Sequence, residues 1–176
     1  MSKKIQKELQ VPIQGWFAQD AQFEMGPVFE RAQNIRGFQI ASPSLMGIRC
    51  VKSSFSMIKD AGIDVIAQKA ATGTQMMIDL YDAWLAPLGF ELNTSRDSKE
   101  RGGHISLVHP DAAQICVALR EISNVIPDYR TPNSIRLAIS PLPTSFVEVW
   151  DGFARMRDLV ASGQYKTIKE GGSRVT

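Results

Sequence analysis

The sequence has few of the residues that hold metals or build disulfide frameworks. Its 176 residues include two cysteines and two histidines. Cys50 and Cys116 lie in apolar contexts outside any Cys-x-x-Cys motif, which is typical of an intracellular chain with buried thiols. A tetrahedral Cys/His zinc site is disfavoured by this count, so we expect no metal.

No charge of one sign dominates the chain, and no long hydrophobic run interrupts it. Twenty Lys and Arg against 18 Asp and Glu leave a net charge of +2. A nucleic-acid-binding protein normally carries a basic face with aromatic stacking platforms, and neither is evident. No stretch approaches the roughly 20 apolar residues of a bilayer span, and residues 1–20 hold no signal-like apolar region. We therefore expect no nucleic-acid partner, no membrane association and a cytoplasmic location.

What the chain does contain is enough apolar material for one core, because 44% of its residues are hydrophobic. Apolar residues three and four positions apart predict helices. The predicted helices cover residues 2–10, 45–61, 64–86, 110–122 and 144–160. Ser42 or Ser44 is the expected N-cap of the second helix, and Gly62 lies at its end.

Shorter alternating segments predict strands between these helices. The predicted strands cover residues 90–92, 104–109, 125–129 and 134–140, with a further short strand at 38–40. A turn at Pro132-Asn133 separates the last two predicted strands of the main series. Locally paired helices and strands indicate an α+β fold, a small, mostly antiparallel sheet covered by helices on one face, preceded by an irregular N-terminal segment.

Common catalytic motifs are absent from the sequence, but three residues suggest chemistry. Trp16 lies in an irregular segment, where its indole either packs or donates a hydrogen bond. Ser42 precedes a predicted helix, so it is either a plain cap or a contact to an anion. Arg136 interrupts an apolar strand, as an edge residue or as a planar clamp for a carboxylate. His104 and His109 fall on opposite strand faces and cannot act together.

Several longer motifs follow one another in a specific order. They are Pro-Ile-Gln-Gly-Trp-Phe at 12–17, Arg-Gly-Gly-His at 101–104, His-Pro-Asp at 109–111, Asp-Tyr-Arg-Thr-Pro-Asn at 128–133, Ile-Arg at 135–136, Pro-Leu at 141–142 and Phe-Val-Glu-Val-Trp-Asp at 146–151. Together they resemble kynureninase, the pyridoxal-phosphate (PLP) enzyme that hydrolyses L-kynurenine to anthranilate and L-alanine. The resemblance runs from about residue 7 to residue 160.

The resemblance implies roles for three residues. Trp16 and Ser42 match positions that contact the cofactor phosphate, and Arg136 matches the arginine that binds the substrate α-carboxylate. It also implies the small-domain fold of fold-type-I PLP enzymes, a homodimer, and 3-hydroxykynurenine as a further substrate. The chain departs from the family at Ser42, where Asn or Thr is usual, and at Pro143, where Tyr is usual.

The resemblance further implies that the chain is the C-terminal part of such an enzyme. The lysine that forms the Schiff base with PLP precedes the Gly-Trp segment in this family and has no counterpart here, so we expect the chain alone to be inactive. Residues 1–43 would be a remnant of the large PLP-binding domain, 44–163 the small domain and 164–176 a frayed tail.

Two alternatives remain open from the sequence. The chain could be a non-catalytic, free-standing small domain that acts in binding or dimerisation. A relative of the cysteine desulfurases, another fold-type-I family, is disfavoured because their C-terminal domains lack the Gly-Trp segment.

Overall fold

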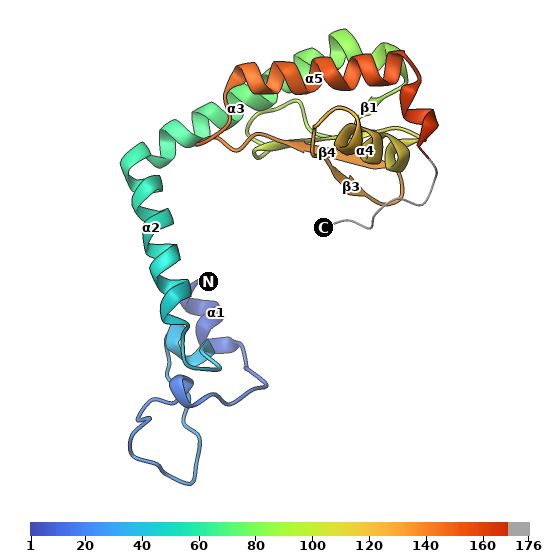
Figure 1. Cartoon of the computed structure of the whole chain (residues 1–176). Coiled ribbons are helices and arrows are strands. Elements are labelled where there is room, and N and C mark those ends of the chain that lie inside the picture. Colours follow the sequence, from blue (N-terminus) through green and yellow to red (C-terminus); the bar gives the residue numbers. More distant parts are fainter. Residues whose placement is uncertain (169–176) are drawn as a thin grey trace. The chain divides into compact units, whose positions relative to one another are not determined.

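A computed structural model describes residues 1–168 of the chain, which divide into an N-terminal unit, Met1–Met57, and a C-terminal unit that begins at Ile58. Figure 1 shows the helices and strands of both. The N-terminal unit contains helix α1 (Lys3–Glu8), 3-10 turns at Trp16–Ala18 and Ile35–Phe38, and most of helix α2 (Leu45–Ala61). Gly62, with φ of 83°, separates α2 from helix α3, and this positive φ favours glycine.

The C-terminal unit is a four-stranded antiparallel sheet with helices packed on it. The helices are α3 (Ile63–Leu80), α4 (Ala112–Glu121) and α5 (Phe146–Ala161). The strands are β1 (Glu91–Leu92), β2 (His104–Val108), β3 (Asp128–Arg130) and β4 (Ser134–Ala138), in the order β1-β2-β4-β3. In Figure 1, α3 and α5 run side by side over the sheet. The predicted α+β fold is confirmed.

Alternation along the strands places the core on one face of the sheet. Ile105 pairs with Leu137 and Leu107 with Ile135, and all four side chains are buried. Together with residues such as Leu119 on α4, they form one continuous apolar cluster. Because successive strand residues point to opposite faces, the residues between them lie on the other face.

We call this other face the polar face. Its members on β2, β3 and β4 are His104, Ser106, Val108, Asp128, Arg130, Ser134, Arg136 and Ala138. None of these residues is buried, whereas their neighbours on β2 and β4 pack under the helices. The sheet is thus covered on one side, and the polar face stays accessible in the part of the chain that the structure describes.

The helix ends explain where the regular elements stop. Helix α5 begins with a capping box, in which the Ser145 hydroxyl accepts from the Glu148 N–H and the Glu148 carboxylate accepts from the Ser145 N–H. Helix α3 continues through a π-helical turn at Tyr81–Leu85 and a 3-10 turn, and ends at Gly89 with φ of 90°.

Several local predictions differ from the structure. The strand expected at 38–40 is wrong: Ile35–Phe38 is a 3-10 turn, because the Asn34 side chain accepts from the Arg36 N–H and closes the chain into a turn. Of the two expected N-caps of α2, Ser44 is the one that accepts from the Gly47 N–H. The strands expected at 125–129 and 134–140 are the shorter β3 and β4.

The two cysteines also differ from each other. Cys116 is buried on α4, and burial raises the pKa of its thiol to about 12. Cys50 is exposed on α2, so the prediction that both thiols are buried is wrong. No residue of α2 is buried, which leaves this thiol at the surface.

The predicted tail begins with ordered structure. Gln164–Thr167 forms a 3-10 turn, and Tyr165 is buried, with its hydroxyl donating to Asp111 at 2.8 Å. The rest of the predicted tail, 169–176, lies outside the described residues.

Candidate functional site

Arg136 lies in the middle of the polar face. It pairs with Ser106 on β2 and with Asp128 on β3 in the antiparallel register. Its side chain is 39% exposed, while both strand neighbours point into the core. The guanidinium is therefore half-exposed, and it projects from a central strand of the sheet.

The carboxylate of Asp128 holds this guanidinium. Its Oδ2 atom accepts from Arg136, and also from the Nε–H and a terminal N–H of Arg130 at 3.1 and 2.7 Å. Burial by itself would raise the pKa of Asp128, but the hydrogen bonds and charges of the two arginines outweigh it and lower that pKa below its usual value. Asp128 is therefore ionised at neutral pH.

This three-residue cluster carries a positive charge. Two guanidinium groups share one carboxylate, so the sum is +1, and the cluster is half-exposed rather than sealed. Arginine presents five N–H donors in a fixed plane. Apart from its bond to Asp128, the N–H groups of Arg136 have no hydrogen-bond acceptor within residues 1–168. The cluster can thus accept a planar anion such as a carboxylate.

Asp128 and Arg130 were not among the residues predicted to form the site. They occur in the Asp-Tyr-Arg motif, but that motif alone does not show which of its side chains faces Arg136. The signal that could find them is the cross-strand register. Two strands joined by a three-residue loop at 131–133 place residue 128 opposite residue 136.

The two histidines lie on different sides of the sheet, as their spacing predicts. His104 is exposed on the polar face, two residues along β2 from Ser106. His109 is buried, and its Nδ1 atom accepts from the Asp111 N–H at 3.0 Å. Its ring packs against Phe90, with centroids 4.6 Å apart. His109 therefore has a structural role in the core.

Trp16 and Ser42 are both in the N-terminal unit, on segments that meet at Gly15. Gly15 is buried, and a Cβ atom built on it would lie 2.5 Å from the Ile40 Cα. Only glycine therefore allows this approach, which accounts for the glycine in the Gly-Trp motif. Since Trp16 follows Gly15 and Ser42 is two residues beyond Ile40, the backbone brings the two candidate phosphate ligands into one region.

The Trp16 indole both packs and donates, which were the two readings left open by the sequence. Its ring contacts Phe17 and Phe23 edge-on, at centroid distances of 5.7 and 5.6 Å. Its N–H donates to the backbone carbonyl of Gln22. Trp16 remains 47% exposed, so its outer edge is accessible.

These residues fit a phosphate group in part. Ser42 is exposed and does not cap α2, so its hydroxyl is available. The Trp16 N–H could reach a phosphate by giving up the Gln22 carbonyl, an exchange of a neutral hydrogen bond for a charge-assisted one. Both residues lie in the N-terminal unit, on segments that approach each other at Gly15 and Ile40, and Arg136 lies in the other unit.

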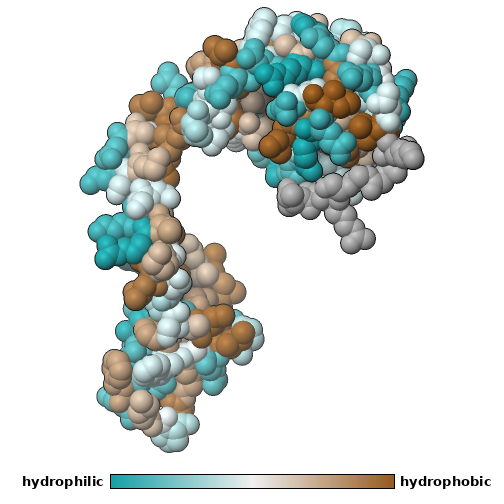
Figure 2. All heavy atoms as spheres, viewed as in Figure 1, coloured by the Kyte–Doolittle hydropathy of each residue, from teal (hydrophilic) through white to brown (hydrophobic). Residues whose placement is uncertain are grey.

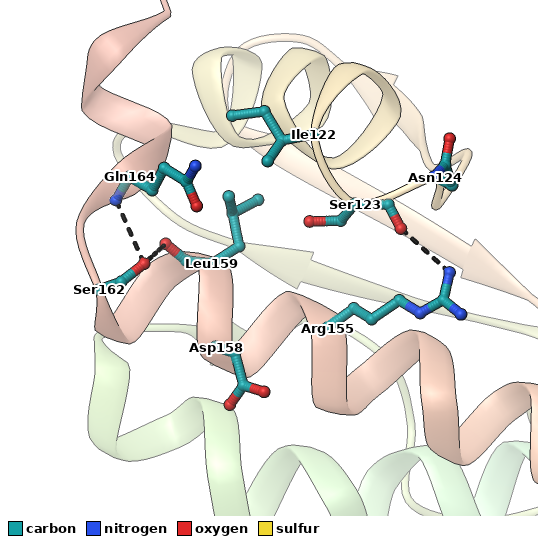
Figure 3. A pocket seen from close by; sticks show the side chains of 8 residues that line it. All are labelled: Ile122, Ser123, Asn124, Arg155, Asp158, Leu159, Ser162 and Gln164. Carbon is teal, nitrogen blue, oxygen red and sulfur yellow. Dashed lines mark hydrogen bonds between the residues drawn. The ribbon is translucent and has the colours of Figure 1, made fainter.

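A separate groove lies between the end of α4 and helix α5, with a volume of about 640 Å³ (Figure 3). Its lining residues are Ile122, Ser123, Asn124, Arg155, Asp158, Leu159, Ser162 and Gln164. Arg155 donates to the Ser123 carbonyl across it at 3.2 Å. The groove is open and contains none of the predicted site residues, so it contributes nothing to the candidate site.

The described residues offer neither a metal site nor a membrane span. No group of three or more His, Cys, Asp or Glu side chains in residues 1–168 could hold a metal ion. Over the same residues, every helix is too short or too polar to cross a bilayer.

Comparison with known proteins tests the resemblance seen in the motifs. The family model described as the kynureninase C-terminal domain matches residues 66–156. Curated relatives named kynureninase come from Geobacillus thermodenitrificans (strain NG80-2), 38% identical over 156 residues, and Bacillus thuringiensis subsp. konkukian (strain 97-27), 35% identical over 159 residues. These alignments cover 88% and 89% of this chain, but 36% and 37% of the relatives.

The chain therefore spans little more than a third of the length of the curated relatives it matches. The family match includes the whole of β2, α4, β3 and β4, and with them the Asp128–Arg136 cluster. The resemblance to kynureninase is confirmed: this chain belongs to the kynureninase family.

Proposed function

We propose that this chain supplies the small domain of a PLP-dependent hydrolase that cleaves L-kynurenine to anthranilate and L-alanine, and 3-hydroxykynurenine to 3-hydroxyanthranilate and L-alanine. The observation that carries the proposal is the polar face, where an arginine on a rigid central strand is half-exposed within a cluster of charge +1. The reaction belongs to tryptophan catabolism and NAD biosynthesis. The cytoplasmic location expected from the sequence remains a prediction.

Arg136 is the proposed ligand of the substrate α-carboxylate. Its planar N–H groups can bind both carboxylate oxygens, which fixes the orientation of the amino-acid end as well as its position. Orienting the substrate in this way lowers the entropic part of the barrier. The scissile bond is then held at a constant place relative to the cofactor.

Trp16 and Ser42 are the proposed ligands of the PLP phosphate, through the indole N–H and the hydroxyl. When bound, PLP supplies the electron sink that makes cleavage of the Cβ–Cγ bond possible. The residues of this chain position the cofactor and substrate, while the lysine that bonds PLP would come from outside the matched region. The active unit would then be a homodimer of complete subunits.

The first experiment mixes the purified 176-residue chain with PLP and L-kynurenine. We expect neither hydrolysis nor a visible absorbance band of bound PLP that survives dialysis, because no lysine here lies in the family's context for bonding PLP. Supplying the remaining two thirds of a family member, as a fusion or a second chain, should give both hydrolysis and a retained band of bound PLP. Turnover by the 176-residue chain alone would contradict this assignment.

The second experiment separates the two proposed binding roles in such an active assembly. Arg136→Lys keeps the charge but loses the planar fork, so it should raise KM for L-kynurenine and leave PLP retention unchanged. Trp16→Phe should weaken PLP retention by about 0.5–1.5 kcal/mol, the value of one hydrogen bond. Equal effects of both substitutions on PLP retention would show that the roles are misassigned.

A second candidate is a non-catalytic domain that acts in binding or dimerisation. The observation in its favour is the continuous core of the C-terminal unit, which needs no contribution from elsewhere. Failure of every assembly to hydrolyse L-kynurenine, with Arg136 still binding carboxylates, would favour this candidate.

A further inference from the structure

The Arg136 guanidinium is held by one acceptor in a defined place. Asp128 lies directly opposite Arg136 in the β3–β4 register, on the same face of the sheet. Its Oδ2 atom accepts the hydrogen bond from Arg136, and the carboxylate is 28% exposed. This contact is set by the backbone pairing of two strands, and both side chains project from the strands themselves.

We propose that Asp128 is a positioning residue, which fixes the Arg136 guanidinium in the orientation that receives the substrate carboxylate. This inference rests on the proposed function of Arg136. Asp128 accepts from Arg136 through one oxygen and one terminal nitrogen of the guanidinium, so the other N–H groups are not used in this contact. The arginine is thus oriented before the substrate arrives.

Pre-orientation matters because arginine is a long side chain with several rotatable bonds. A guanidinium that is free in solution loses rotamer freedom when it binds a carboxylate, and that loss weakens binding. A guanidinium already fixed by Asp128 has lost this freedom on folding. Binding of the substrate carboxylate then no longer carries the entropic cost of ordering this side chain.

Arg130 keeps Asp128 from neutralising the site. A lone Asp128–Arg136 pair would have no net charge, so it would attract a substrate carboxylate only weakly. Arg130 donates two hydrogen bonds to the same Oδ2 atom and brings the cluster to +1. Asp128 can therefore orient Arg136 while the cluster still attracts an anion.

A purely structural role explains this arrangement less well. Ion pairs between partly exposed side chains contribute little to stability, and the three residues of the cluster are half-buried or exposed, on the face opposite the core of the C-terminal unit. The C-terminal unit offers a matched pair for comparison, since Arg96 donates to both carboxylate oxygens of Asp82 at 2.7 and 2.8 Å. That pair is exposed and involves no predicted site residue.

The kinetic test uses the active assembly and compares Asp128→Asn with Asp82→Asn. The first should raise KM for L-kynurenine about tenfold and leave kcat within about twofold. It should also weaken competitive inhibition by L-alanine, which carries an α-carboxylate, without affecting inhibition by L-alaninamide, which does not. Asp82→Asn should leave KM, kcat and both kinds of inhibition unchanged.

Arg136→Lys in the same assay distinguishes failure of the positioning role of Asp128 from failure of the proposed role of Arg136. If Arg136→Lys raises KM and Asp128→Asn does not, the positioning role is overturned while the proposed function stands. If Arg136→Lys leaves KM unchanged, the proposed function itself fails.

A second measurement requires no catalysis. In the 176-residue chain, the signal of the terminal Nη–H group of Arg136 that donates to Asp128 should be sharp in nitrogen-15 NMR and slow to exchange with water. Asp128→Asn should broaden it or speed its exchange, and Asp82→Asn should not. An Arg136 signal that is unchanged in Asp128→Asn would overturn the proposal.

Discussion

The two units of this chain are stabilised in different ways. The C-terminal unit buries a continuous apolar cluster that runs from α3 through the sheet to α5. The buried hydrophobic residues of the N-terminal unit are only Ala18 and Ala32. In Figure 2, hydrophobic side chains are visible at the surface of the N-terminal unit and along α2. Since apolar burial is the main favourable force in folding, the C-terminal unit has the larger source of stability.

The N-terminal unit relies instead on hydrogen bonds to its backbone. Arg36 donates to the carbonyls of Gln19 and Asp20 at 2.8 and 2.6 Å, and Arg31 donates to the carbonyl of Gln6 at 3.1 Å. Such bonds add little net stability because water competes for the same groups. The comparison shows that the residues proposed to hold phosphate lie in the unit with the weaker intrinsic stability.

The largest expected difference is between the units as separate polypeptides. Residues 58–176 should unfold in one cooperative transition, because they retain the core. Residues 1–57 should show no cooperative transition, because a segment of this size with two buried alanines cannot offset its conformational entropy. Circular dichroism during heating and in urea measures both, with the 176-residue chain as reference. A cooperative transition in 1–57 would show that the N-terminal unit is stable on its own.

The next effect is that of removing apolar side chains from each unit. Leu119→Ala should lower the free energy of unfolding by about 2–5 kcal/mol, because Leu119 is fully buried and leaves a cavity. Val51→Ala on α2 should change it by no more than about 0.5 kcal/mol, because Val51 is 54% exposed. Urea titration of each variant gives the values. Similar losses in both variants would show that α2 is packed in solution.

The smallest expected effect is a pH dependence confined to the C-terminal unit. Burial lowers the pKa of His109; the Asp111 charge and a hydrogen bond at the Leu88 backbone oppose this shift, and the Lys166 charge adds to it. The unfolded chain therefore binds a proton that the folded chain does not, so stability should fall as pH drops below about 6.5.

Urea titrations at about pH 7.5 and about pH 5.5 measure this effect. His109→Gln should reduce the difference in stability between the two values, and His104→Gln, at an exposed position, should not. An equal reduction in both variants would mean that burial of His109 is not the cause. The N-terminal unit contains no histidine, so it should contribute nothing to this difference.

Helix and strand types were largely predictable because their signals are local. The periodicity of residues 45–61 and 64–80 shows on the sequence alone, and so does the alternation at 104–108. The exposure of α2 was not predictable, because an apolar stripe at helical spacing indicates only that a helix has a face to bury. Cys50 was misplaced for the same reason.

Turn chemistry explains the strand wrongly expected at 38–40 and decides between the two candidate caps of α2. Residues 38–40 alternate like a strand, but the Asn34 side chain closes a 3-10 turn just before them. Ser42 and Ser44 are equally good caps by residue type. Helix α2 begins at Leu45, which places the hydroxyl of Ser44, not that of Ser42, beside the free Gly47 N–H.

The sequence by itself determined that Arg136 would interrupt an apolar strand, and that Gly15 and Trp16 would mark a tight segment. Only the tertiary structure decided what faces Arg136. The turn at Pro132-Asn133 predicts a hairpin, but a two-residue loop there would place Tyr129 opposite Arg136. The three-residue loop places Asp128 there instead. Because a shift of one residue moves every side chain to the other face of a sheet, loop length decided whether Arg136 met a carboxylate.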